Sequence, residues 1–345
     1  MKVAVVAPLV TPLRPTATGG SQAFLVDLAR GLKRRGHEVL LYCAAPSEVP
    51  GLELVQVPVA AGLDQALVVM KGTTQRVAAM RDAFVTLYGE LRGRGADVVS
   101  QHAFDAEAIE LAEDLPILHT LHLPPIVPAI CAAVLASKAG FCAPSRSARE
   151  AWQRAGLAEV ALVPNGIPEW EPGSAETARL ALIAGRISPE KGVDVGLRAA
   201  AEAGLSRLVV GSVYDQAYFD DQVRPLLKPG EMLPAMPRQR LWGVMARASV
   251  LLAPIDWEEP FGLAVAEAQM AGCPVAGYRL GALPEVVEEG VSGRLAEPGD
   301  FDGLVTAIAE ALDLDREGVR ASARRRLSLE RSLDAYEAAL SEVAR

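Results

Sequence analysis

Short apolar runs alternate with stretches of helical periodicity along the whole chain of 345 residues. Runs rich in Val, Leu, Ile and Ala, without strict polar alternation, are typical of strands buried on both faces of a parallel sheet. The sequence therefore predicts an α/β fold in which helices cover both faces of parallel sheets. The expected strands are Val3–Pro8, Val39–Cys43, Asp97–Ser100, Ile117–Leu121, Gly140–Ala143, Ala161–Val163, Ala181–Ala184, Arg207–Gly211, Val250–Ala253, Pro274–Ala276 and Gly293–Leu295.

A segment without periodicity divides these strands into two groups. Its sequence, PEWEPGS from Pro168, is rich in Pro, Gly and Glu, which is typical of a linker. The chain length suits two domains of ordinary size. We expect domains at 1–168 and 179–328, a linker at 169–178, and a final helix at 329–345. Two doubly wound domains facing each other would leave a central cleft lined by the carboxyl ends of their strands, where ligands bind.

Two glutamates, Glu259 and Glu267, flank a Pro-Phe-Gly turn that leads into an apolar helix. Pro260 suits the first turn of a helix and Gly272 suits its end, which places Glu259 before the helix and Glu267 about two turns into it. A helix N-terminus attracts phosphate, and carboxylates accept hydrogen bonds from hydroxyl groups. The pattern therefore favours a ligand with phosphates and hydroxyls, such as a nucleotide-sugar, over a solvated glutamate before an ordinary helix.

The segment EPFGLAVAEAQMAGCPV, with its E-x7-E pattern, resembles the signature of the family 4 retaining glycosyltransferases, also called group 1 glycosyltransferases. Five more segments resemble the same family, and their correct order over about 280 residues makes the resemblance specific. They are GGSQAFLVDLARGLKRRGHEVLLY from Gly19, HTLH from His119, PNGI from Pro164, GRISPEKGVD from Gly185 and GALPEVVEEGVSGRL from Gly281.

The resemblance implies the GT-B fold, with an N-terminal acceptor-binding domain and a C-terminal nucleotide-sugar-binding domain. It also implies that the final helix crosses back to the first domain. The activity implied is the transfer of a sugar, with retention of configuration, from a nucleotide-diphosphate sugar to a hydroxyl acceptor. We expect no metal and no cofactor, since the nucleotide-sugar is a substrate.

Two basic residues stand where such a reaction needs positive charge. Negative charge grows on the departing diphosphate, and without a metal it must be stabilised by cations and amides. Arg186 follows an expected strand, and Lys191 comes at the start of the next helix, where Gly192 allows close backbone approach. The resemblance gives Arg186 and Lys191 the diphosphate role; incidental charges near a helix start are the alternative.

The resemblance assigns further donor-binding roles. Glu267 would bind the ribose hydroxyls and Glu259 the hydroxyls of the transferred sugar. Backbone groups of the remaining residues would contact sugar, phosphate or nucleoside, namely Gly19, Gly20, Gly211, Phe261, Gly262 and Leu263. Residues 232–237 stand where the family usually has a strand with a glycine that contacts the base, so uridine is expected only because it is common in the family.

On the acceptor side, His122 follows an expected strand and can hydrogen-bond a sugar hydroxyl or move a proton. His119 is expected to face the sheet. The roles given above leave no clear carboxylate nucleophile for a double displacement. We therefore hypothesise a front-face transfer, in which the departing diphosphate takes the proton of the acceptor.

Composition limits the partners and the compartment. The net charge is −9, and residues 169–345 supply all of it, with 19 basic and 28 acidic side chains, so nothing indicates nucleic-acid binding. The basic residues near Lys33 could touch anionic lipid, although a solvated helix face is preferred. Four scattered cysteines predict free thiols and hence the cytoplasm, and no apolar run is long enough to span a membrane.

Two other functions remain open from the sequence. One is a different sugar-nucleotide enzyme of the same fold, an epimerase or a hydrolase. The other is a noncatalytic protein that binds sugar-nucleotides. The acceptor, the donor sugar and base, the linkage and the oligomeric state do not follow from the sequence.

Overall fold

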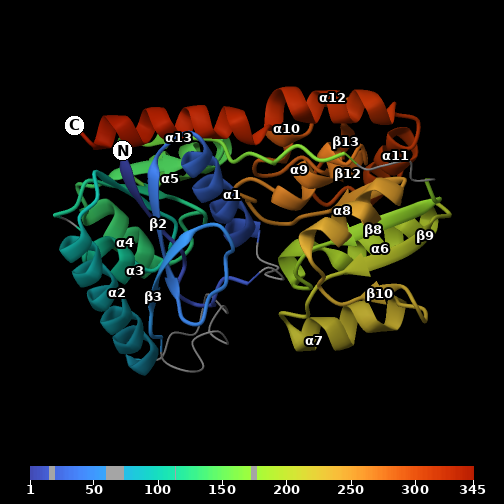
Figure 1. The fold of residues 1–345 in the computed structure, drawn as a ribbon. Helices are drawn as coiled ribbons and strands as arrows, with labels where there is room; N and C mark the ends of the chain where they lie inside the picture. The colour runs from blue at the N-terminus through green and yellow to red at the C-terminus, as the bar shows by residue number, and fades with distance from the viewer. Residues whose placement is uncertain (15–19, 60–73, 113, 172–176) are drawn as a thin grey trace. The chain divides into compact units, whose positions relative to one another are not determined.

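The computed structural model describes residues 1–14, 20–59, 74–112, 114–171 and 177–345 (Figure 1). These residues divide into two compact units. Unit 1 consists of Met1–Gly166 together with Leu329–Arg345, and unit 2 consists of Ile167–Ser328. Each unit has a parallel sheet and a hydrophobic core of its own.

Within its described residues, unit 1 has a seven-stranded parallel sheet in the order β3-β2-β1-β4-β5-β6-β7. The strands are β1 (Lys2–Val6), β2 (Glu38–Ala44), β3 (Glu53–Val57), β4 (Val98–Gln101), β5 (Ile117–Thr120), β6 (Gly140–Ala143) and β7 (Ala161–Leu162). The strand order reverses where β1 pairs with β4. In open α/β sheets, ligands bind beyond the carboxyl ends of the strands at such a switch point.

Helices cover this sheet on both faces. They are α1 (Gly20–Arg34), α2 (Thr74–Arg94), α3 (Ala106–Glu110), α4 (Pro128–Ala136), α5 (Arg146–Arg154) and α13 (Leu329–Val343). Figure 1 shows α13, in red, beside α1, in blue. A Cβ atom on Gly31 of α1 would lie 2.6 Å from the Leu333 side chain of α13, so the small glycine lets the two helices approach closely.

Ion pairs also connect α1 and the residue after it to α13. Arg35, at the end of α1, forms ion pairs with three carboxylates of α13, those of Glu330, Asp334 and Glu337. The neighbouring Arg34 also pairs with Glu330. Arg34 and Arg35, which belong to the basic run considered above as a lipid contact, therefore pair with acidic residues of α13.

Within its described residues, unit 2 has a six-stranded parallel sheet in the order β10-β9-β8-β11-β12-β13. The strands are β8 (Leu180–Ala184), β9 (Ser206–Val210), β10 (Met232–Leu233), β11 (Val250–Ala253), β12 (Val275–Tyr278) and β13 (Gly293–Ala296). The order reverses where β8 pairs with β11, which places a second switch point at the carboxyl ends of these two strands.

The helices of unit 2 pack on both faces of its sheet and enclose two hydrophobic clusters. They are α6 (Val193–Glu202), α7 (Gln216–Tyr218), α8 (Arg238–Arg247), α9 (Leu263–Met270), α10 (Leu283–Val286), α11 (Phe301–Ala311) and α12 (Arg316–Leu327). One cluster includes Met245, Val265 and Leu283, and the other includes Leu197, Leu252 and Ile308.

Every strand expected from the sequence is present, and the parallel α/β fold is confirmed. Two edge strands, β3 and β10, were missed. Strand β3 contains Glu53 and Gln56, which are exposed, and β10 is only two residues long. The expectation that residues 232–237 lack a strand is therefore wrong, since Met232 and Leu233 pair with β9.

The prediction of free thiols is confirmed, because Cys43, Cys131, Cys142 and Cys273 are all free. Burial raises the pKa of Cys142 and of Cys273 to about 12. Among the described helices, none is both long and apolar enough to cross a membrane.

Candidate active site

A lysine and a glutamate meet at the switch point of unit 2. Lys191 ends a short 3-10 turn, Pro189–Lys191, after β8, and Glu259 lies in the loop after β11. The Nζ atom of Lys191 is 2.5 Å from Oε2 of Glu259, and Trp257 donates its indole N–H to the same oxygen at 2.7 Å. The ammonium also lies 5.4 Å from the centre of the Trp257 ring. Lys191 and Glu259 were predicted as site residues from the sequence, whereas Trp257 was not.

This pair keeps Glu259 ionised. Burial raises the pKa of Glu259, but the charge and hydrogen bond of Lys191, the hydrogen bond from Trp257 and the charge of Arg186 outweigh it, so that the pKa lies below its ordinary value. The side chains of Lys191 and Glu259 are 19% and 13% exposed. A ligand can therefore still reach them at the surface of unit 2.

Two close backbone approaches join the loop after β11 to the loops after β8 and β12. Gly192 has φ +60°, and a Cβ atom there would lie 2.2 Å from the carbonyl oxygen of Pro254. Gly281 has φ +59°, and its Cβ atom would lie 2.4 Å from the backbone nitrogen of Glu259. Neither position accepts a side chain. The close approach expected at Gly192 exists, and it is made to the protein's own backbone.

Arg186 stands at the carboxyl end of β8, as expected from the sequence. Its guanidinium lies 5.3 Å from the ring centre of Tyr214 and 3.5 Å from a carboxylate oxygen of Glu190. Its side chain is 36% exposed. Arg186 is therefore held loosely and is accessible to an anion near Lys191.

Helix α9 begins later than the sequence predicted. Gly262 is its N-cap with φ +84°, and the first helical residue is Leu263, so Pro260 lies outside the helix. Glu267 is consequently little more than one turn into α9, and the expectation of two turns is wrong. Because a left-handed residue cannot continue a right-handed helix, the glycine and not the proline fixes the start. Gly272, with φ +76°, follows the helix end as predicted.

The turn before α9 offers free backbone donors. Among the described contacts, the N–H groups of Phe261, Gly262 and Leu263 donate no hydrogen bond to another residue. The Phe261 side chain is buried at 5% exposure and anchors the turn. Free N–H groups at a helix start favour an anion there.

Glu267 is the fifth residue of α9 and is 7% exposed. Its Oε1 accepts a hydrogen bond from Nε of Arg238 at 2.5 Å, and the Arg238 guanidinium lies 4.6 Å from the ring centre of Trp242. Arg238 was not among the residues predicted for the site. Its position just after Pro237, at the first residue of α8, is the signal that could have drawn attention to it.

Gly211 follows β9, where the resemblance placed a wall of the nucleoside site. A Cβ atom on Gly211 would lie 1.8 Å from the carbonyl oxygen of Gly185, which follows β8. The N–H group of Gly211 donates to the carbonyl of Leu233 at 3.2 Å. The structure therefore gives Gly211 a packing reason in addition to its expected role.

In unit 1, His122 follows β5 at the carboxyl end of the sheet, as predicted. Its Nε2 atom lies 3.0 Å from Nδ1 of His102, and Nε2 of His102 lies 2.9 Å from the hydroxyl of Ser100. Burial lowers the pKa of His122 to about 4, so the ring is neutral at pH 7. The sequence did not single out His102, although it follows β4 just as His122 follows β5.

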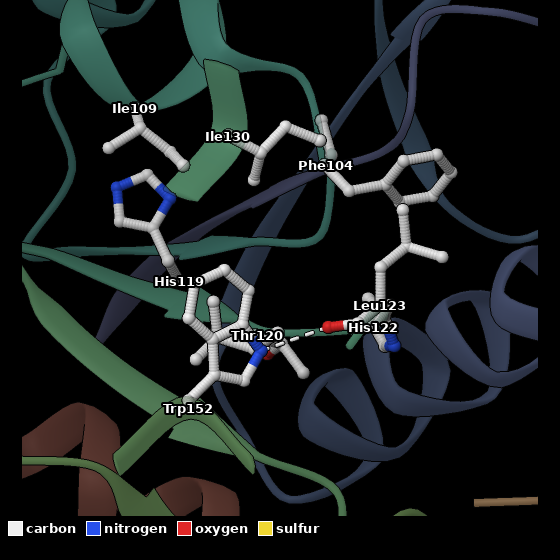
Figure 2. A pocket seen from close by; sticks show the side chains of 10 residues that line it. Phe104, Ile109, His119, Thr120, His122, Leu123, Ile130 and Trp152 are labelled. Atoms are coloured by element: carbon white, nitrogen blue, oxygen red, sulfur yellow. Dashed lines mark hydrogen bonds between the residues drawn. The ribbon is translucent and has the colours of Figure 1, made fainter. Parts of the chain in front are cut away.

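A small cavity of about 20 Å³, large enough for about one water molecule, lies beside His122 (Figure 2). His119, on β5, lines it together with Phe104, Ile130 and Trp152, whose indole N–H donates to the Leu123 carbonyl at 2.9 Å. Both ring nitrogens of His119 are buried without a partner among the described residues. Burial lowers the pKa of His119 to about 3, and the ring stacks on Phe141 at 5.3 Å.

Of the glycine pair expected on this side, Gly20 is the first residue of α1, and Gly19 lies outside the described residues. The structure thus brings Arg186, Lys191 and Glu259 together in unit 2. Glu267 pairs separately with Arg238. His122 joins His102 in unit 1.

Family comparisons agree with this arrangement. The family model described as Glycosyltransferase Family 4 matches residues 18–170, and the one described as Glycosyl transferases group 1 matches residues 168–327. A D-inositol 3-phosphate glycosyltransferase of Mycolicibacterium smegmatis is 29% identical over 93% of this chain and 86% of its own. A glycogen synthase of Mycobacterium tuberculosis is 31% identical over 46% of this chain and 41% of its own.

Solved structures share the fold over nearly the whole chain. AviGT4, a glycosyltransferase involved in avilamycin A biosynthesis, has a TM-score of 0.72 at 23% identity and covers 99% of this chain and 98% of its own. Anabaena HepE in complex with UDP-glucose has a TM-score of 0.76 at 19% identity, covering 99% of this chain and 100% of its own. The chain therefore belongs to the group 1 glycosyltransferases of family 4 and has the GT-B fold.

Proposed function

We propose that this glycosyltransferase moves a sugar from a nucleotide-diphosphate sugar, with UDP-sugar as the expected donor, to a hydroxyl acceptor with retention of configuration and without a metal. The observation that carries the proposal is the contact of Lys191 with Glu259 beside Arg186. Two cations and a carboxylate lie at one switch point, and this supports a ligand that carries both a diphosphate and hydroxyl groups.

The donor phosphates are the natural ligands of the cations. Arg186 offers a planar fork to a diphosphate and Lys191 offers a mobile point charge. The free N–H groups of Phe261, Gly262 and Leu263 add donors that need not reorganise as charge develops. Cations and amides in these places can take the role that a metal has in other glycosyltransferases, and on this ground we propose metal independence.

The carboxylates hold the hydroxyl groups of the donor. Glu259 has a lowered pKa and is therefore ionised, so it can accept hydrogen bonds from hydroxyls of the transferred sugar. Glu267 accepts hydrogen bonds from the ribose hydroxyls while Arg238 balances its charge. HepE, which has the same fold, was solved in complex with UDP-glucose, and this supports a UDP-sugar as the first donor to test.

The chemical step we propose takes place on one face of the sugar. The acceptor oxygen forms a bond to the anomeric carbon as the bond from that carbon to the diphosphate oxygen breaks. The departing oxygen takes the proton of the acceptor hydroxyl, so that no separate base is needed. Lys191 and Arg186 stabilise the charge that grows on the diphosphate.

The direct test is a panel of nucleotide-sugars that differ in base and sugar. Thermal stabilisation and slow release of the nucleotide by one of them would support the proposal and name the donor. Inositol 3-phosphate, taken from the name of the Mycolicibacterium smegmatis relative, is the first acceptor to add. Product NMR would give the anomeric configuration, and unchanged turnover in a chelator would support metal independence. If none of the panel binds, the donor site proposed here is wrong.

A further inference from the structure

Two buried side chains, Ser100 and His102, and the half-buried His122 form a hydrogen-bonded row. Ser100 on β4 contacts Nε2 of His102 at 2.9 Å, and Nδ1 of His102 contacts Nε2 of His122 at 3.0 Å. Ser100 and His102 are both 0% exposed. The other ring nitrogen of His122, Nδ1, has no hydrogen-bond partner among the described residues and is not one of their fully buried polar atoms, and His122 as a residue is half-buried.

The row can carry its hydrogen atoms in two ways. In the first arrangement, Ser100 donates to His102, His102 donates from Nδ1 to His122, and His122 carries its own proton on the outward Nδ1. In the second, His122 donates from Nε2 to His102, His102 donates from Nε2 to Ser100, and the outward Nδ1 of His122 is an acceptor. The first makes His122 a donor towards a ligand, and the second makes it a base.

The surroundings of Ser100 distinguish the two arrangements. Among the described residues, its hydroxyl contacts His102 and no other group. In the first arrangement the hydroxyl hydrogen is used in that contact. In the second, it is buried with no acceptor, which costs free energy. The first arrangement is therefore the more stable.

Among the described residues, the ring of His102 has no hydrogen-bond partner other than Ser100 and His122. The rings of Phe24 and Tyr336 lie 6.3 Å and 5.9 Å from its ring centre. The phenol of Tyr336 bonds to Thr120 at 3.1 Å and not to the histidine. Burial, followed by the charges of His122 and His119, lowers the pKa of His102 well below its usual range, which agrees with a pair of neutral rings.

We infer that Ser100 and His102 hold His122 in the tautomer with its proton on Nδ1, so that His122 donates a hydrogen bond to a substrate hydroxyl and does not accept its proton. His102 and Ser100 are then positioning residues. The part of this inference that concerns substrate rests on the proposed function. It also leaves the departing diphosphate as the group that takes the proton of the acceptor.

The tautomer can be measured in the free protein by NMR of the ring nitrogens. The chain has 4 histidines, so single substitutions assign the signals. We expect a protonated Nδ1 and an unprotonated Nε2 in His122 of the wild-type protein. The reverse pattern would overturn the inference, whatever the donor panel shows. If no nucleotide-sugar is turned over, the proposed function fails but this measurement still decides the tautomer.

Variants of His102 separate positioning from packing. In His102→Asn, the side-chain amide can still donate near the place of Nδ1, whereas His102→Phe fills the space without donating. We expect H102F to populate the second tautomer of His122 and to lower kcat/KM for donor turnover about tenfold, and H102N to retain both properties largely. An unchanged His122 tautomer in H102F would contradict the inference.

Two further variants distinguish the proposed effect from a folding defect. Ser100→Ala removes the hydroxyl donor with little change of shape, and we expect both tautomers of His122 in it. His119→Phe is the matched control, because it removes a nearby buried imidazole that makes no hydrogen bond among the described residues. H119F should keep the wild-type tautomer of His122 and the wild-type turnover. A single unchanged tautomer in S100A would count against the role of Ser100.

Discussion

The ammonium of Lys191 and the carboxylate of Glu259 lie 68 positions apart in the chain, yet their charged atoms are 2.5 Å apart. A bound diphosphate would have to share this lysine with the glutamate. Glu259 holds the Lys191 side chain by a direct ion pair, and Lys191 helps to keep the pKa of Glu259 below its ordinary value. In the proposed function, the two residues would hold each other in place while each binds a different part of the same donor.

The first prediction concerns the charge of Lys191. Lys191→Ala should lower donor turnover by about 10²–10³-fold, because the diphosphate loses a cation that acts where charge develops. The fold should survive, since Trp257 still donates to Glu259. Steady-state nucleotide release and a thermal melt measure the two effects. Lys228→Ala changes an exposed lysine of the same unit and should have no effect on turnover. Near-normal turnover of K191A would refute the role of this lysine.

The second prediction concerns the proposed ribose contact. Glu267→Gln should weaken nucleotide binding about tenfold, because a neutral amide oxygen accepts a hydroxyl hydrogen bond less strongly than a carboxylate does. Calorimetric titration with UDP measures the change. The control is Glu317→Gln on α12, where the side chain is 76% exposed. Equal affinity in E267Q and the wild type would show that Glu267 serves only to hold Arg238.

The third prediction is a loss of stability in acid. Burial lowers the pKa of His119 from 6.5 to about 3 in the folded chain. As pH falls below about 6.5, the unfolded chain takes up a proton at this ring and the folded chain does not, so the free energy of unfolding decreases. Above that pH the contribution is constant.

His119→Phe isolates this effect. It should reduce the pH dependence of the unfolding free energy between pH 6 and 4 by up to about 1.4 kcal/mol per pH unit. Urea unfolding at several pH values, followed by a signal from unit 1, measures it. The neutral rings of His102 and His122 should leave part of the acid sensitivity in place. Curves of the same slope for H119F and the wild type would contradict the prediction.

The fourth prediction concerns Gly211. Gly211→Ala places a Cβ atom where the Gly185 carbonyl oxygen stands, at 1.8 Å, so the strand ends must move apart. We expect a loss of about 3 kcal/mol in the stability of unit 2. Gly243→Ala, in the interior of α8 with no atom within 4 Å, should instead stabilise by about 0.5–1 kcal/mol. Denaturant unfolding compares the two variants, and equal stability of both would show that the backbone relaxes easily around Gly211.

The sheets could be predicted because most of their strands are buried on both faces and therefore continuous in apolar residues. The edge strands β3 and β10 were not predicted. Glu53 and Gln56 interrupt the apolar pattern of β3, and β10 is too short to have an apolar pattern. The start of α9 was misplaced since Pro260 and Gly262 both suit a helix start, and only the left-handed backbone of Gly262 decides between them.

Within the site, Arg186 and His122 could be placed from the sequence because each follows a strand, and Glu259 and Glu267 because they belong to the motif around the start of α9. Their partners could not. His102 meets His122 because β4 pairs with β5 in a register that aligns Gln101 with His119, and the sequence does not show that register. Arg238 reaches Glu267 across 29 positions from another helix, and no local pattern predicts such a contact.

Helix α13 gives unit 1 an unusual order of synthesis. Its residues, Leu329–Val343, leave the ribosome after every residue of unit 2, although they belong to unit 1. A nascent chain that ends before residue 329 would hold all of unit 2 but lack the Leu333 and Tyr336 side chains that pack against α1. The unit encoded first is thus completed last, and until then the apolar surface around Gly31 and Phe24 would be open to chaperones.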